Sequence, residues 1–134
     1  MRTLRHLPIV LALVFLAACS AESTTNPCDG PRTVSVSADP VPVISWAPVC
    51  DAAWVTVQDV TADTQPYVWT IVDTNVGFQS PLTYGVLPSG HGASTVIVEP
   101  QPLVVGHEYK VMIYRQRDVG ETFPIEAGST TFTR

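Results

Sequence analysis

The sequence predicts an all-β domain, a single antiparallel β-sandwich of seven to eight strands. Short β-branched runs recur along the chain, separated by Pro, Gly, Asp and Asn, and no segment after the N-terminus keeps a helical period. The chain has twelve prolines, and apart from Pro8 they cluster where strands end or where no backbone donor is needed. Together these observations favour a sandwich of short strands.

The strands are expected in the following order. Residues 34–37 alternate apolar and polar side chains and begin the domain. The other runs are residues 41–46, 54–60, 67–72, 82–87, 95–98, 107–115 and 129–133. The core is expected to contain Trp46, Val55, Val57, Tyr109, Val111, Ile113 and Phe132.

Two segments resemble fibronectin type III domains. The run PVPVISWAP, residues 40–48, resembles their second strand, and LVVGHEYKV, residues 103–111, resembles their L-x-x-G-x-x-Y-x-V corner. The resemblance covers roughly residues 31–134. It implies that Trp46 is central to the core and that the Tyr109 hydroxyl bonds back to the turn before it. The run SPLTYGVLPSG, residues 80–90, departs from the family, and so would a disulfide, so the sheet assignment of residues 61–90 is left open.

The N-terminus predicts export and lipid attachment. Arg2 and Arg5 precede an apolar run, residues 7–16, that is too short to span roughly 30 Å of hydrocarbon. The run Leu16-Ala17-Ala18-Cys19 resembles the bacterial lipobox, which implies diacylglycerol on Cys19 and cleavage before it. The alternative is an ordinary signal peptide with a chance cysteine. We expect a signal peptide over residues 1–18, the lipidated cysteine and a tether over 19–30, and the sandwich over 31–134.

The predicted location is therefore the cell envelope, with the membrane reached through covalent lipid on Cys19. Each buried methylene contributes about 0.8 kcal/mol, so two or three acyl chains hold firmly where one does not. Ser20 resembles the residue that permits transfer to the outer membrane in a host with two membranes. Residues 20–27 are small and polar, and read as a flexible tether with a reach on the order of 16 Å.

Charge and cysteine content narrow the possible functions. Without Arg2 and Arg5 the mature chain keeps five of seven basic residues and all twelve acidic ones, a formal charge of −7. This balance argues against nucleic acid and against anionic headgroups as partners. Cys28 and Cys50 are an even pair in an oxidising compartment, so a disulfide is expected. A two-cysteine metal site is the alternative, but no further cysteine or histidine lies near them.

No pattern of catalytic residues or cofactor ligands emerges, and the sequence is not expected to be an enzyme. His107-Glu108 lacks the second histidine of a metalloprotease helix, since position 111 is valine. The run Ser89-Gly90-His91-Gly92 reads as a glycine-rich turn. Three acids, Asp59, Asp63 and Asp73, could gather round a weak calcium ion, but their spacing matches no known loop, and solvated turn residues are the preferred interpretation.

One surface offers a binding hypothesis. Strand parity places Trp54, Met112 and Tyr114 together on the outer face of one sheet, joined by Tyr67 or Trp69. A cluster of large apolar side chains on a solvated sheet face is typical of a docking site. We expect a non-catalytic envelope protein whose sandwich binds a partner protein or serves a structural accessory role; the alternative is a module that binds glycan. The alternative is a purely structural role, in which Trp54 covers the edge of the sheet and a neighbouring loop folds over it.

Overall fold

The computed structural model describes residues 26–92, 95–116 and 123–134. A short 3-10 turn, Pro27–Asp29, precedes eight strands. Their bounds are β1 Thr33–Val36, β2 Val43–Ala47, β3 Trp54–Asp59, β4 Tyr67–Val72, β5 Leu82–Thr83, β6 Val96–Val98, β7 Glu108–Arg115 and β8 Ile125–Thr133. The predicted lipidation site Cys19 and the predicted signal peptide lie outside the described residues. Among the described residues, no helix has the length and hydropathy needed to cross a membrane.

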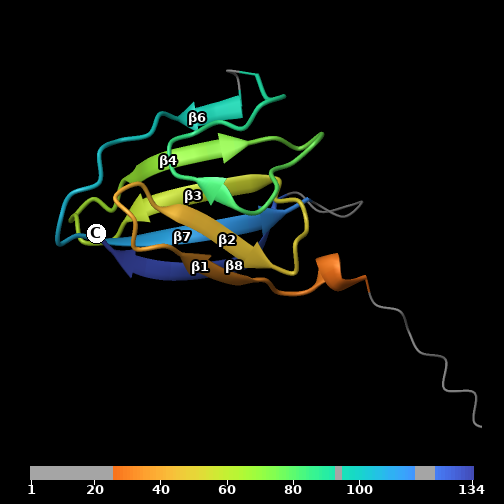
Figure 1. Ribbon diagram of the computed structural model, residues 1–134, viewed down its shortest axis with the longest axis horizontal. Coiled ribbons are helices and arrows are strands. Elements are labelled where there is room, and N and C mark those ends of the chain that lie inside the picture. Colours follow the sequence, from red (N-terminus) through yellow and green to blue (C-terminus); the bar gives the residue numbers. More distant parts are fainter. Residues whose placement is uncertain (1–25, 93–94, 117–122) are drawn as a thin grey trace, which may run out of the picture.

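The strands form two antiparallel sheets that face each other, which confirms the predicted β-sandwich (Figure 1). The smaller sheet has the order β1-β2-β5, and the larger has the order β6-β4-β3-β7-β8. The chain enters the sandwich at one end, beside the 3-10 turn, and its C-terminus lies at the opposite end (Figure 1). We call these the N-terminal end and the C-terminal end.

The space between the sheets is filled by alternate side chains of the strands. Six of the seven predicted core residues are at most 3% exposed: Trp46, Val55, Val57, Tyr109, Val111 and Ile113. The seventh, Phe132, packs against this core from a half-buried position. Its ring lies 5.5 Å from that of Tyr109, centre to centre. Period-two alternation therefore predicted these core residues correctly, and β3 and β4 also bury Thr56 and Thr70 on their other face.

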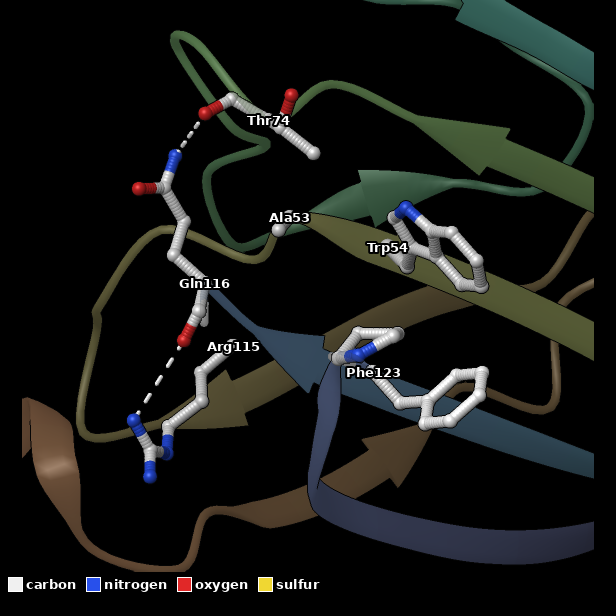
Figure 2. A pocket seen from close by; sticks show the side chains of 7 residues that line it. Ala53, Trp54, Thr74, Arg115, Gln116 and Phe123 are labelled. Atoms are coloured by element: carbon white, nitrogen blue, oxygen red, sulfur yellow. Dashed lines mark hydrogen bonds between the residues drawn. The ribbon is translucent and has the colours of Figure 1, made fainter. Parts of the chain in front are cut away.

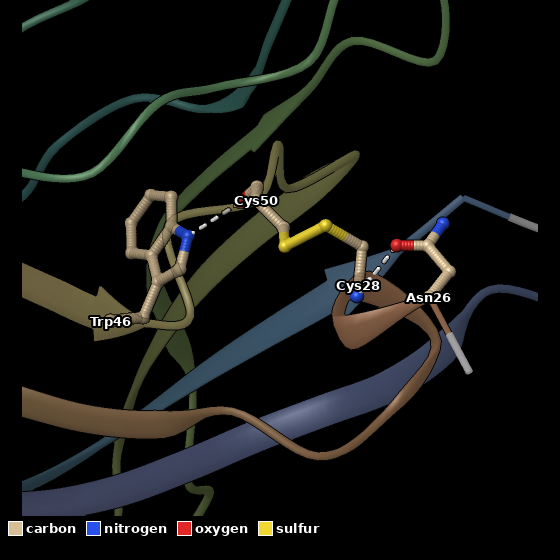
Figure 3. The surroundings of a disulfide bond; sticks show 4 residues. All are labelled: Asn26, Cys28, Trp46 and Cys50. Atoms are coloured by element: carbon tan, nitrogen blue, oxygen red, sulfur yellow. Dashed lines mark hydrogen bonds between the residues drawn. A yellow bond between two sulfur atoms is a disulfide. The ribbon is translucent and has the colours of Figure 1, made fainter. Parts of the chain in front are cut away.

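Two buried aromatic side chains fix loops to the core through hydrogen bonds. The Tyr109 hydroxyl accepts a bond from the Val104 backbone N–H at 2.8 Å, the tyrosine corner that the sequence predicts. At the N-terminal end the Trp46 indole N–H donates to the Cys50 carbonyl at 2.7 Å. Cys50 in turn forms the predicted disulfide with Cys28 (Figure 3). The disulfide thus joins the incoming chain to the loop that the buried tryptophan holds in place.

The segment whose sheet assignment was left open, residues 61–90, crosses from one sheet to the other. β4 has the predicted bounds and lies in the larger sheet between β6 and β3, whereas β5 pairs with β2 of the smaller sheet over only two residues. The predicted strand over residues 82–87 is short because the chain turns at Gly85, where φ is +74°. The Tyr84 hydroxyl lies 2.7 Å from the Gln101 carbonyl and 3.2 Å from that of Val68. This side chain connects the two sheets along that edge.

On the opposite edge, β1 contacts β8 and joins the sheets directly. The Arg32 backbone N–H donates to the Ala127 carbonyl at 2.6 Å. Gly128 faces the Arg32 carbonyl so closely that any side chain there would overlap it. A glycine at this position is therefore what allows the two backbones to meet.

Candidate functional site

The outer face of the larger sheet carries the predicted aromatic cluster. In the β3–β7 pairing Trp54 lies opposite Tyr114, and Thr56 lies opposite Met112. Residues directly opposite in an antiparallel pair point to the same face. Val55 and Ile113, the next pair in the register, are fully buried in the core, so Trp54 and Tyr114 point outward. The parity argument therefore placed Trp54, Met112 and Tyr114 on the correct face.

Their exposure differs from the expectation at one position. The rings of Trp54 and Tyr114 meet edge to face, with centroids 6.0 Å apart and an angle of 67°. Both side chains are half-buried. The Tyr114 hydroxyl lies 3.6 Å from the Met112 sulfur, so the ring extends along β7. Met112 is only 5% exposed, and the expectation that it forms part of a solvated surface was wrong. Met112 lies against Tyr114 and is not itself available for contact.

The adjoining strand contributes Tyr67 to this face and Trp69 to the core. A bulge between Val57 and Gln58 shifts the register of β4, so that Tyr67 lies opposite the outward-facing Gln58. Tyr67 is half exposed, whereas Trp69 is 1% exposed and packs on Tyr84. Burial raises the pKa of Tyr114, and the nearby Glu126 and Tyr67 raise it further. Its phenol therefore stays neutral at physiological pH and acts as a hydrogen-bonding group.

A pocket of about 470 Å³ adjoins Trp54 at the N-terminal end of the same face. Figure 2 shows Trp54 on one side, Phe123 beside it, and Arg115 and Gln116 along the wall. Ala53, Thr74 and Pro124 complete the lining. The Gln116 side-chain amide donates to the Thr74 carbonyl, and the Arg115 guanidinium donates to the Gln116 carbonyl at 3.5 Å. These bonds tie the end of β7 to the loop after β4 and so shape the wall.

Phe123 is the residue of this surface that sequence reasoning missed. It is 77% exposed, among the most exposed large apolar side chains of the described chain. It precedes β8 and lies outside any strand pattern, so parity could not place it. The only signal available was an aromatic residue directly before a proline, Pro124, which favours an extended conformation at a strand entry. Phe123, Trp54 and Tyr114 are hereafter called the aromatic face.

Two histidine–aspartate pairs lie at opposite ends of the sandwich. His91 Nδ1 lies 2.7 Å from Asp73 Oδ2, and His107 Nδ1 lies 2.7 Å from Asp59 Oδ2. The other carboxylate oxygen of Asp73 accepts backbone N–H bonds from Asn75 and Val76, and that of Asp59 accepts them from Thr61 and Ala62. Each pair therefore closes a turn, a role that the sequence reading did not assign to either histidine.

The positions of the two pairs also answer whether Asp59, Asp63 and Asp73 could share a calcium ion. Asp59 and Asp73 are separated by the length of the larger sheet, so they cannot act together. Among residues 26–92, 95–116 and 123–134, no three histidine, cysteine or acidic side chains are grouped as metal ligands would be. The Asp73 pKa is lowered to about 2, chiefly by the N–H bonds from Val76 and Asn75 and then by His91. Such a carboxylate is well satisfied by the protein itself.

No protein-family model, curated protein or solved structure matches this chain.

Proposed function

We propose that the protein is a lipid-anchored, non-catalytic protein of the cell envelope whose sandwich binds a partner protein. The observation that carries the proposal is the aromatic face, where the Trp54–Tyr114 pair continues into a pocket that ends at the exposed Phe123. Aromatic side chains and arginine are enriched in protein interfaces, and a few of them supply most of the binding free energy. Arg115 lines the same pocket.

The ring geometry supports a protein partner over a glycan. Stacking on a sugar needs flat rings presented side by side, whereas Trp54 and Tyr114 meet at 67°. The edges of these two rings and the pocket beside them form an uneven surface, and a side chain of a partner protein would fit into the pocket.

The anchoring part of the proposal rests on the lipobox-like run that ends at Cys19. A chain exported and lipidated there would emerge from the membrane directly into the N-terminal end of the sandwich. The disulfide between Cys28 and Cys50 is consistent with an oxidising compartment outside the cytoplasm.

The binding test is photo-crosslinking in cells that make the full chain. A photoreactive amino acid replaces Glu126, which is exposed beside Tyr114 in the β7–β8 register. The matched control places it at Ser35, which is exposed on β1 of the other sheet. We expect a discrete protein adduct from position 126 and none from position 35. Adding Trp54→Ser should reduce the adduct about tenfold or more.

Equal adducts from the two positions, or an adduct insensitive to Trp54→Ser in a chain that accumulates normally, would contradict partner binding at this face. Competition of the adduct by envelope polysaccharide would favour a glycan ligand instead. In the same cells, Cys19→Ser should release the chain from the membrane fraction. Retention of that variant would contradict the lipid anchor without affecting the binding test.

A further inference from the structure

A second pocket at the N-terminal end is lined by a buried arginine, Arg32, two of whose guanidinium nitrogens have no hydrogen-bond partner among the described residues. Arg32 is 6% exposed, and its Nε and Nη1 atoms are buried with no partner. The ion pairs found among the described residues both involve histidine, so no described carboxylate pairs with it. Burial lowers the pKa of the guanidinium; Asp51 opposes this effect and Arg115 adds to it. Arginine nevertheless stays charged in proteins, so within the described ranges this buried charge has no carboxylate paired with it.

The pocket that Arg32 lines offers groups of both signs. Its volume is about 450 Å³, in the range of small-molecule sites. Arg32 can bond anionic oxygens, Asp29 and Asp51 can bond an ammonium, and Asn75 can serve either. Val76, 65% exposed, is the apolar residue at its edge. A ligand that fits this set carries an anionic group and a cationic group a few bonds apart.

The position of the pocket, close to the proposed lipid anchor, indicates that such a ligand would come from the membrane surface. Cys28 and Cys50 line it, so it lies where the chain enters the sandwich. Seven residue steps separate Cys19 from Asn26, a reach of at most about 25 Å for a fully extended chain. The nine residues of β8 extend about 30 Å from this end to the other. A chain anchored at Cys19 therefore keeps the N-terminal end, and not the C-terminal end, near the bilayer.

We propose that this pocket binds the headgroup of a zwitterionic phospholipid and holds the N-terminal end of the sandwich against the membrane. The phosphate would bond the guanidinium of Arg32, and the ammonium would face Asp29 and Asp51. This inference rests on the proposed lipid anchor, because the anchor is what brings the pocket to the bilayer. Exposed valines alone would not select this end, since Val104 and Val105 are exposed at the C-terminal end.

A zwitterionic lipid also agrees with the charge of the chain. The mature protein carries a formal charge of −7, which disfavours an anionic lipid surface. A headgroup of zero net charge avoids that repulsion and uses both signs of the pocket. The carboxylates at Asp29 and Asp51 would discriminate against a bare phosphate by the same argument.

The test uses the processed chain, residues 19–134, made without lipid as the Cys19→Ser variant. Its binding is measured by calorimetric titration with glycerophosphoethanolamine and with inorganic phosphate, and by co-sedimentation with phosphatidylethanolamine–phosphatidylcholine vesicles. Three variants are compared: Arg32→Met, which removes the charge; Val76→Asp, which places a carboxylate at the pocket edge; and Val105→Asp, the matched control at the C-terminal end, where Val105 is 81% exposed.

We expect Arg32→Met and Val76→Asp to weaken headgroup and vesicle binding about tenfold or more, and Val105→Asp to leave both unchanged. If Arg32→Met does not fold, as judged by its thermal unfolding, the comparison of the two aspartate variants decides. Equal binding by all variants, no binding by the parent chain, or inorganic phosphate binding as tightly as the headgroup would overturn the proposal. Release of the full chain from cell membranes on Cys19→Ser tests the anchor separately, so the two failures are distinguishable.

Discussion

At the scale of single residues, two of the three acids expected to be solvated turn residues, Asp59 and Asp73, close turns through hydrogen bonds. Asp73 accepts two backbone N–H bonds with one oxygen and faces His91 with the other. His91 is itself held against the buried Phe78, with ring centres 4.8 Å apart. The turn after β4 is therefore connected to the core through one carboxylate, and that turn forms part of both pockets.

Asp73 should make stability depend on pH in the acid range. Its pKa is about 2 in the folded protein and about 3.9 in an unfolded chain. Its contribution to stability is complete above about pH 4 and is lost as the pH falls towards 2. Asp73→Asn should lower the unfolding temperature at pH 7, and the difference from the native protein should shrink between pH 4 and 2. A difference that stays constant with pH, or an equal effect from Asp63→Asn in the exposed β3–β4 loop, would contradict this role.

At this scale the sequence predicts the face of the sheet on which a side chain lies, but not whether a neighbouring side chain covers it. Alternation states which face a residue occupies, and it did so correctly for Trp54, Met112 and Tyr114. It does not state where a neighbouring ring will lie, and the Tyr114 ring that extends over Met112 depends on its rotamer. Arg32 illustrates the same limit, since a charged residue before a strand gives no sign that its guanidinium is buried.

At the scale of strands, the edge between β1 and β8 depends on one close backbone contact. Gly128 faces the Arg32 carbonyl, and the neighbouring Ala127 carbonyl accepts the Arg32 N–H. The β1–β8 contact therefore positions both the sheet edge and the arginine of the second pocket.

Gly128→Ala should destabilise the protein by about 1–3 kcal/mol, the usual cost of overpacking, because the added methyl group overlaps the Arg32 carbonyl. Urea unfolding measures the change. Gly30→Ala is the matched control, since a Cβ there meets only the Pro27 carbonyl, at 3.9 Å, which is ordinary contact. A loss below 0.5 kcal/mol for Gly128→Ala, taken from the range of neutral surface substitutions, would show that β1 and β8 can separate without cost.

The strands that the sequence predicted best are the three inner strands of the larger sheet, whose residues are mostly buried. β3, β4 and β7 begin or end within a residue or two of the expected bounds. β5 was poorly predicted because its two residues gain their structure from pairing with β2, almost 40 positions earlier in the chain. β8 begins at Ile125, four residues before the expected start, since its first half pairs with β7 around a register shift and not by regular alternation.

At the scale of the whole molecule, the disulfide lies at the end of the sandwich to which the proposed lipid anchor would be attached. Replacing both Cys28 and Cys50 with alanine should lower the free energy of unfolding by about 3 kcal/mol, from the entropy of closing a loop with a sequence separation of 22. Urea unfolding of the variant, compared with the native protein in its oxidised form, measures this. An unchanged midpoint would mean that the incoming chain is held by its other contacts, of which the Arg32–Ala127 bond is the nearest.

The two proposals together define an orientation. With the N-terminal end against the bilayer, the larger sheet stands upright and the aromatic face points sideways along the membrane surface. A partner bound there would itself be membrane-associated, or would approach within a few tens of ångströms of the bilayer, as the length of β8 requires.

The covalent link between Cys28 and Cys50 also decides how the molecule would carry mechanical load. A pull between the proposed lipid anchor and the C-terminus would enter the sandwich at Cys28 and pass through the sulfur atoms to Cys50. β1 and β2 lie between those two cysteines in the chain and are bypassed by the force. Tension is therefore borne first by β3 and β8, and the stretched oxidised chain is about 70 Å shorter than the reduced one.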